Sequence, residues 1–185
     1  MLEILIPPQE FFNEETSEFV RPKCLGKDGK KLRLEHSLVS ISKWESNWKK
    51  RFLTKEDKTS EEVRDYVRCM TLTQNVDPEV YLYLTAENIK EINDYIRDPM
   101  SGTTFPKEKP KTGYREETSS ELIYYWMVAL EIPVEFQRWH FNRLLNLIRI
   151  CNIKNAPQKK SSMNDIISQQ KKIEAANRAK LHLHG

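Results

Sequence analysis

The sequence of 185 residues contains only five glycines, one of which is the last residue. Glycine is the residue that adopts positive φ angles without steric cost, so a glycine-poor chain makes few sharp backbone reversals. It also lacks material for the glycine-rich loops that cradle nucleotide phosphates. The scarcity of glycine therefore favours a mostly helical fold.

The N-terminal third is the exception and predicts β-structure. Residues 2–6 are mainly apolar and are followed by two prolines, which is typical of a short strand. The segments 18–21 and 31–34 alternate polar with apolar side chains. Asp28-Gly29 lies between them and is a dipeptide that tight hairpin turns prefer. We therefore expect a small antiparallel hairpin, or a three-stranded ribbon, within the first 35 residues.

From about residue 38 the spacing of apolar residues becomes helical. Leu38, Ile41, Trp44, Trp48 and Phe52 lie three or four positions apart, as on one face of an amphipathic helix. Capping signals predict further helix starts, which fall after Thr59, at Asp77-Pro78, after Thr85, at the capping box Thr118-Ser119-Ser120-Glu121 and at Pro133. The fold class predicted is mostly α with a small N-terminal antiparallel β-ribbon, an α+β arrangement. The two most apolar helices, over 118–130 and 133–151, are expected to form the centre of the core.

Two segments interrupt the helical pattern. Residues 98–117 contain three prolines, two glycines and mixed charges, which predicts a long exposed loop. Residues 154–185 carry seven basic and two acidic side chains, a net charge of +5, so the first 153 residues carry −2. Their apolar residues are too sparse to offset the cost of ordering a lone helix. We expect a helical domain with an N-terminal hairpin over 1–153 and a basic, conditionally helical tail over 154–185.

The sequence contains none of the common enzyme motifs: no P-loop, dinucleotide-binding fingerprint, nucleophile elbow or zinc-protease helix. Its three cysteines are far apart and form no CxxC pair, which argues against a disulfide framework and a cysteine zinc site. His140 lies on an apolar helix face and is expected to be a core histidine with one hydrogen-bond partner. We therefore expect no enzyme and no catalytic, cofactor-binding or metal-binding residues.

The segment KWESNWKK (43–50) allows two interpretations. Trp44 and Trp48, flanked by lysines, could stack on the bases of a single-stranded nucleic acid. Alternatively they anchor the core, because they continue the apolar face that Leu38 and Ile41 begin. The continuity of the face favours core packing. The same reasoning applies to residues 124–126, where Tyr125 is the side chain expected to be exposed.

The block SLVSISKWESNWKKRFL (37–53), the following TSEE (59–62) and the stretch RCMTLT (68–73) resemble the small tail assembly chaperones of long-tailed bacteriophages. The closing segment MNDIISQQKKIEAANRAKLHLHG (163–185) is similar to the short basic endings of such proteins. The genes of this family lie just ahead of the tape-measure gene. The resemblance implies a non-enzymatic protein that coats the long, helical tape-measure protein and helps recruit tail-tube subunits around it.

The resemblance thus implies the tape-measure and tail-tube proteins as partners, without a cofactor, and it also allows self-association. A basic segment that becomes helical on binding suits many weak contacts along an extended helix. The candidate partner-binding residues are the basic and the branched apolar side chains of the tail: Lys159, Lys160, Ile166, Ile167, Lys171, Lys172, Ile173, Arg178 and Lys180.

Two other functions fit the same sequence. A structural virion protein, such as a connector or tail-completion component, could order the same tail against neighbouring subunits. A nucleic-acid-binding accessory protein could use the charge of +5, although nucleic acid and membrane are not the partners we expect. The N-terminus has no basic region of a signal peptide, and no apolar run reaches the 18 residues of a membrane span. The expected location is the cytoplasm of a bacterial host, without secretion.

Overall fold

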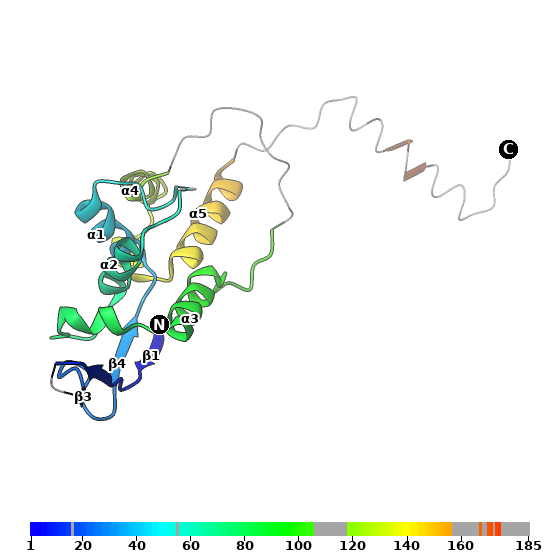
Figure 1. Cartoon of the computed structure of the whole chain (residues 1–185). Coiled ribbons are helices and arrows are strands. Elements are labelled where there is room, and N and C mark those ends of the chain that lie inside the picture. The colour runs from blue at the N-terminus through cyan, green and yellow to red at the C-terminus, as the bar shows by residue number, and fades with distance from the viewer. Residues whose placement is uncertain are drawn as a thin grey trace, which may run out of the picture. The chain divides into compact units, whose positions relative to one another are not determined.

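The computed structural model describes residues 1–15, 17–54, 56–105 and 118–156, together with residues 167, 170, 171, 173 and 174. The chain divides into two compact units, Met1–Asn152 and Ile153–Gly185. In the first unit, helices pack around a small antiparallel sheet near the N-terminus (Figure 1). The expected α+β fold class is confirmed.

The strands form two separate antiparallel pairs rather than one ribbon. β1 (Leu2–Ile6) pairs with β4 (Lys30–Leu34), whereas β2 (Phe11–Asn13) pairs with β3 (Glu18–Val20). The expected pairing of 18–21 with 31–34 is therefore wrong. Burial explains why β4 pairs with β1 and not with β3, because the inward side chains of β1 and β4 are almost fully buried and those of β3 are exposed.

Glycine is required at one turn next to β4. Gly29 has a φ of +81°, and a Cβ atom there would lie 2.3 Å from the carbonyl oxygen of Ile6. Only a residue without a side chain allows the chain to approach β1 this closely before it enters β4. The Asp28-Gly29 signal thus marks a turn, although the turn does not join the two strands that the sequence predicts.

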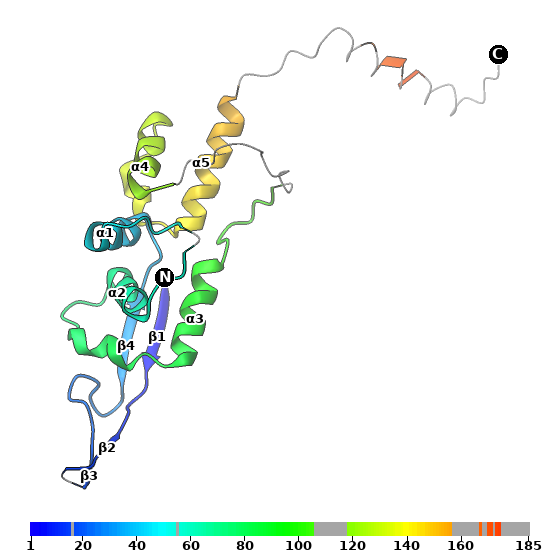
Figure 2. The ribbon, with the colours of Figure 1, turned by 45° about the horizontal axis from the view of Figure 1, so that its top comes forward.

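The helices follow in chain order and enclose the β1–β4 pair from several sides (Figure 2). Three capping boxes are formed, with Ser37, Thr59 and Thr85 as N-caps. The helices are α1 (Leu38–Trp48), α2 (Ser60–Met70), the 3-10 helix η1 (Pro78–Tyr83), α3 (Ala86–Arg97), α4 (Ser120–Ala129), the 3-10 helix η2 (Val134–Arg138) and α5 (Phe141–Asn155).

Two predicted helix starts need correction. α4 is capped by Ser119 and has no capping box, because Leu122 at the third helical position has no polar side chain to accept a hydrogen bond from the Ser119 backbone N–H. The helix expected over 133–151 is broken into η2 and α5, with Trp139 extended between them. Residues 98–105 of the expected loop contain no helix or strand, and the rest of that loop lies outside the described residues.

The core is shared among the sheet and most helices. Its largest fully buried side chains include Leu25, between β3 and β4. The others come from β1 and β4, from α1 and α2, and from α4 and α5: Ile6, Leu32, Leu34, Leu38, Ile41, Trp44, Val67, Met70, Ile123, Phe141 and Leu144. The expectation that the last two apolar helices form the centre of the core is therefore only partly correct. Ile123 and Met127 are the buried apolar residues of α4.

Candidate functional site

Four exposed apolar side chains gather on the pair formed by β2 and β3, here called the ribbon. The ribbon lies beyond the lower ends of β1 and β4 (Figure 2). Its four apolar side chains are about half to two-thirds exposed: Phe11 48%, Phe12 55%, Phe19 70% and Val20 48%. Clustered apolar exposure of this kind marks interaction surfaces more often than scattered single residues do.

The two faces of the ribbon differ in their surroundings. Phe11 pairs with Val20 and Phe12 with Phe19, and successive strand residues point to opposite faces, so each pair lies on its own face. The Phe11 ring lies 5.7 Å from the ring of Tyr83 in η1. Gln9 Nε2 donates a hydrogen bond of 2.7 Å to the Tyr83 carbonyl oxygen. The Phe11 face is therefore turned toward the helical body, and the Phe12 face is turned away from it.

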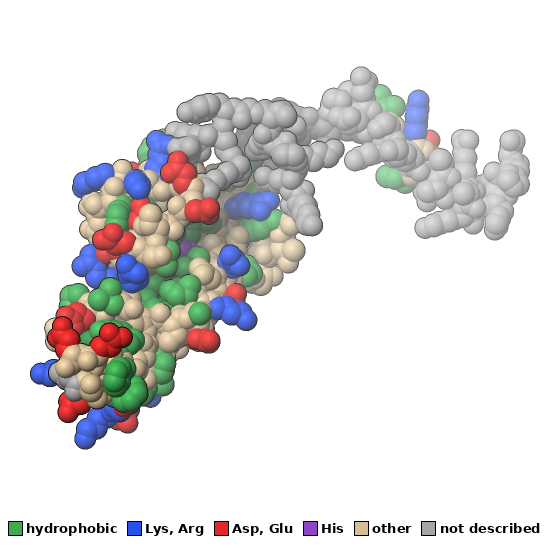
Figure 3. All heavy atoms as spheres, viewed as in Figure 1, with side chains coloured by type: hydrophobic (Ala, Val, Ile, Leu, Met, Phe, Trp, Pro, Cys, Tyr) green, Lys and Arg blue, Asp and Glu red, His purple; other side chains and the backbone are tan. Residues whose placement is uncertain are grey.

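The outward face consists of an aromatic pair in a charged frame. The rings of Phe12 and Phe19 meet edge to face with centroids 5.4 Å apart. An ion pair between Arg21 and Glu10 borders them on one side. Figure 3 shows hydrophobic side chains gathered with acidic and basic ones at this end of the first unit. No other described element covers this aromatic pair, so its rings present an open apolar surface.

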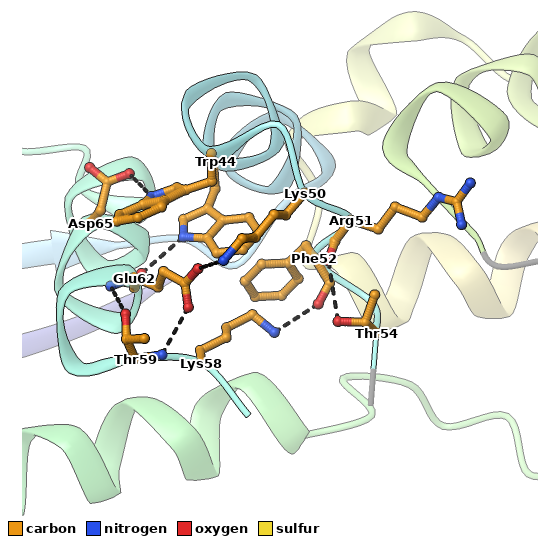
Figure 4. Close-up of polar contacts among 10 residues, drawn as sticks. Trp44, Lys50, Arg51, Phe52, Thr54, Lys58, Thr59, Glu62 and Asp65 are labelled. Carbon is orange, nitrogen blue, oxygen red and sulfur yellow. Dashed lines mark hydrogen bonds and ion pairs between the residues drawn. The ribbon is translucent and has the colours of Figure 1, made fainter. Parts of the chain in front are cut away.

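The tryptophans do not form a binding platform. Trp44 is 1% exposed, and its Nε1 donates a hydrogen bond of 2.9 Å to the Glu62 carbonyl oxygen (Figure 4). Trp48 is half-buried and its Nε1 donates to Asp65 Oδ2 at 2.9 Å. Base stacking needs an open ring face, which Trp44 lacks. The core interpretation of Trp44 is confirmed, and Tyr125 is exposed as expected.

A cavity of about 380 Å³ lies beside Trp44, and the basic and acidic side chains in its wall compensate one another. Lys50 Nζ lies 2.7 Å from Glu62 Oε1, an ion pair that lowers the pKa of Glu62 and raises that of Lys50. Lys58 Nζ donates to the Phe52 carbonyl oxygen at 2.8 Å and lies 4.4 Å from the Phe52 ring centre, and burial lowers its pKa (Figure 4). With Glu56 also in its wall, the cavity has no uniform charge that would select an anion.

Two buried histidines form the other titratable cluster. His36 Nδ1 is 2.5 Å from the Tyr66 hydroxyl, His140 Nε2 is 3.1 Å from the Tyr95 carbonyl oxygen, and the two rings are 5.2 Å apart. Burial lowers the pKa of both, that of His36 to about 3, so both are neutral at pH 7. They are 2% and 7% exposed, and His140 also lines a cavity of about 280 Å³ together with Glu35 and Arg143. His140 has the single partner that the sequence predicts.

No group of three or more His, Cys, Asp or Glu side chains within the described residues is arranged to hold a metal ion. The three cysteines are free, and burial raises the pKa of the Cys69 thiol to about 11, which keeps it protonated at neutral pH. Neither observation identifies a reactive centre in the described part of the chain.

The candidate residues of the basic tail are only partly described. Ile167, Lys171 and Ile173 are helical and exposed. The remaining tail candidates lie outside the described residues: Lys159, Lys160, Ile166, Lys172, Arg178 and Lys180. Their role in partner binding stays a prediction from the sequence.

Sequence reasoning did not select the ribbon, although a signal for it was present. Phe11 and Phe12 are adjacent, so in a strand they must point to opposite faces, and a two-stranded ribbon can bury only one face against its own protein. Glutamates close to both strands add to the signal. An adjacent aromatic pair in an acidic, short-stranded segment thus indicates at least one exposed ring.

Comparisons with protein-family models, with curated proteins and with solved structures found no match. Within the described part of the chain, no helix combines the length and the apolar character that crossing a membrane requires. The functional conclusion therefore rests on the residues and their geometry.

Proposed function

We propose that the chain is a tail assembly chaperone of a long-tailed bacteriophage, which binds the tape-measure protein and promotes assembly of the tail tube around it. The resemblance of residues 37–53, 59–62 and 68–73 to that family supports the proposal. The single structural observation that supports it most is the outward face of the ribbon, where Phe12 and Phe19 are 55% and 70% exposed. The proposal assigns the chain a binding role and no catalytic step.

The ribbon contributes modest binding energy, which suits a chaperone. Covering the exposed parts of two phenylalanine rings removes on the order of 200 Å² of apolar surface, worth about 5 kcal/mol before the costs of association. Such a contact alone is weak and reversible. Many copies along one extended partner reach useful occupancy through multivalency, and each copy can still leave when tube subunits arrive.

The basic tail is the second proposed contact. Of its candidate residues, Ile167 and Ile173 are 43% and 60% exposed, so both side chains are available to a partner. Lysines and arginines there add electrostatic attraction that weakens with salt. The ribbon and the tail together give each copy two weak contacts, which increases avidity without requiring one tight site.

Co-expression with the neighbouring tape-measure protein tests the proposal. The full chain should keep that protein soluble, and Phe12→Thr/Phe19→Thr should not, because threonine retains β-propensity but removes the aromatic surface. Tyr125→Ala is the matched control, since it removes an equally exposed ring from another element. Tape-measure protein that is equally insoluble with and without the full chain would refute the function.

Purified particles distinguish a chaperone from a structural virion component. A chaperone is released during assembly, so the chain should be present in infected cells and absent from mature particles. A fixed number of copies in every particle would instead support the connector or tail-completion function. Deletion of residues 158–185 tests the tail in the same co-expression assay, and undiminished solubility of the tape-measure protein would place all binding in the first 157 residues.

A further inference from the structure

We infer that the outward face of the ribbon recognises a basic amphipathic helix, with two aliphatic side chains one turn apart and lysines or arginines around them. The inference rests on the proposed protein-binding function and goes beyond it by specifying the chemistry of the bound segment. It depends on the spacing of two rings, on the charge around them and on the absence of a covering element within the described residues.

The spacing of the rings matches the spacing of side chains on a helix. Phe12 and Phe19 lie on neighbouring strands with ring centroids 5.4 Å apart. Side chains at positions i and i+4 of a helix are about 5–6 Å apart. Each of two aliphatic side chains one turn apart can therefore contact one ring. The face is limited to these rings by the Glu10–Arg21 ion pair, so it suits one turn of a helix rather than a broad surface.

The charge around the rings favours a cationic partner. Residues 9–21 contain four glutamates and one arginine, a net charge of −3. Arg21 pairs with Glu10, whereas Glu14, Glu15 and Glu18 are exposed and form no ion pair with any described residue. A helix that carries lysines or arginines beside its aliphatic pair would meet Glu14 and Glu15, which follow Phe12 in the turn, at the edge of the contact. Glu18 alternates to the face of Phe11 and Val20 and contributes through the net charge of the ribbon. Complementary charge at an interface increases the association rate and selects among partners.

The same charge disfavours the other molecules that could cover an aromatic face. A second copy that binds face to face would bring its own carboxylates against those of the first. Anionic lipid headgroups and nucleic-acid phosphates carry the same sign as the ribbon and would be repelled. Of the occupants considered, the basic amphipathic segment is the one that offers both apolar contact and opposite charge.

Synthetic peptides test the inference on the intact, isotope-labelled protein. The basic probe is an alanine-rich helix of about 18 residues with one leucine pair at i and i+4 and lysines beside it. The acidic probe replaces each lysine by glutamate, and the dispersed probe moves the second leucine to the opposite side of the helix. Amide chemical shifts recorded during titration give both the dissociation constant and the residues contacted.

The basic probe should shift the amides of residues 10–21 and bind at least tenfold more tightly than either control probe. Phe12→Thr/Phe19→Thr should lose this binding. Removal of three carboxylates should weaken binding about fivefold at low salt and reduce its salt dependence. The charge variant is Glu14→Gln/Glu15→Gln/Glu18→Gln, and its control with the same change in net charge is Glu91→Gln/Glu131→Gln/Glu135→Gln.

Equal binding of the acidic and basic probes, or shifts that lie outside the ribbon, would overturn the inference. Ribbon-specific binding of anionic vesicles or of a DNA oligonucleotide in place of the basic probe would also overturn it. The proposed function fails separately, in the co-expression assay. If the tape-measure protein stays soluble and solubility requires Phe12 and Phe19, but the basic probe shows no preference, the function stands and the partner chemistry is wrong.

Discussion

Replacing Trp44 by alanine removes the side chain around which α1 and α2 pack. Trp44 is 1% exposed, its ring lies 5.3 Å from that of Phe52 and 6.2 Å from that of Trp48, and its Nε1 bonds to the Glu62 carbonyl oxygen. Truncation of a buried tryptophan costs about 3–5 kcal/mol, and loss of its hydrogen bond adds about 1 kcal/mol. A domain of ordinary stability has only about 5–15 kcal/mol in total.

Urea unfolding measures this loss directly. For a domain of this size the free energy of unfolding falls by roughly 2 kcal/mol per molar urea, so Trp44→Ala should lower the midpoint by roughly 2 M. Trp44→Phe keeps most of the apolar volume and loses the N–H donor, so it should lose about 1–2 kcal/mol. Tyr125→Ala is the surface control and should stay within about 0.5 kcal/mol of the wild type.

The relative stabilities of these three variants show whether Trp44 anchors the core. If Trp44→Ala unfolds at the same urea concentration as Tyr125→Ala, Trp44 does not anchor the core. If Trp44→Ala does not fold at all, Trp44→Phe still provides the test, because a core anchor predicts a smaller but measurable loss. A phenylalanine variant as stable as the wild type would show that the hydrogen bond to Glu62 contributes nothing.

Three other perturbations have expected outcomes. The pKa of His36 is about 3 in the folded state and near 6.5 when unfolded. The contribution of His36 to the free energy of unfolding is therefore complete above pH 6.5 and falls by about 1.4 kcal/mol per pH unit below it. Urea midpoints should drop between pH 7.5 and pH 5, and they should drop less in His36→Gln. Gly29→Ala should lose about 2 kcal/mol or more in the same assay, whereas Gly26→Ala, with φ of +70° and nothing within 4 Å of its Cβ, should lose about 1 kcal/mol. Removal of residues 157–185 should lower the melting temperature by less than about 2 °C in calorimetry, and a loss of several degrees would show that the tail stabilises the first unit.

Helix starts were predictable where the signal is local. Thr59 Oγ1 accepts from the Glu62 backbone N–H at 3.2 Å, and Glu62 Oε2 accepts from the Thr59 N–H at 2.8 Å. Both partners lie within four residues, so the sequence TSEE contains the whole interaction. Asp77 before Pro78 and Thr85 before α3 are local signals of the same kind, and both cap the predicted elements.

The start of α4 shows where local reasoning ends. The sequence suggests that Glu121 completes a capping box, but the Ser120 backbone N–H donates to Glu45 Oε2 of α1 at 2.8 Å. The other oxygen of Glu45 accepts from the Phe52 backbone N–H at 2.8 Å. One buried carboxylate therefore serves two distant segments, and spacing along the chain cannot reveal it.

The break between η2 and α5 has a similar cause. Apolar spacing predicts one helix from Pro133, yet the Phe141 backbone N–H donates to the His36 carbonyl oxygen at 2.7 Å, and Ser37 forms a β-bridge with His140. These contacts with a segment about 100 residues earlier need extended backbone before α5. The tertiary hydrogen bonds outweigh the local helical preference.

Which strands pair depends on which segment is buried, and the alternation of polar and apolar residues does not show that. Segments 18–21 and 31–34 alternate equally well, but only the second brings its apolar side chains into the core, where Leu32 and Leu34 are fully buried against β1. The other edge of β4 is also occupied, because the Leu72 backbone N–H donates to the Arg33 carbonyl oxygen at 2.7 Å. With both edges of β4 engaged, β3 pairs only with β2.

This exclusion from the main sheet is what exposes the candidate site. A two-stranded ribbon is marginally stable alone, and this one is held to the body by Gln9 and Phe11 at Tyr83. The contact between Phe12 and Phe19 adds about the 0.2–1 kcal/mol of a cross-strand pair, whereas the ribbon's attachment to η1 runs through Gln9 and Phe11. Large aromatic side chains in water are a cost that stability of the free protein does not require. A partner that covers them gives these two residues a purpose that the fold alone does not.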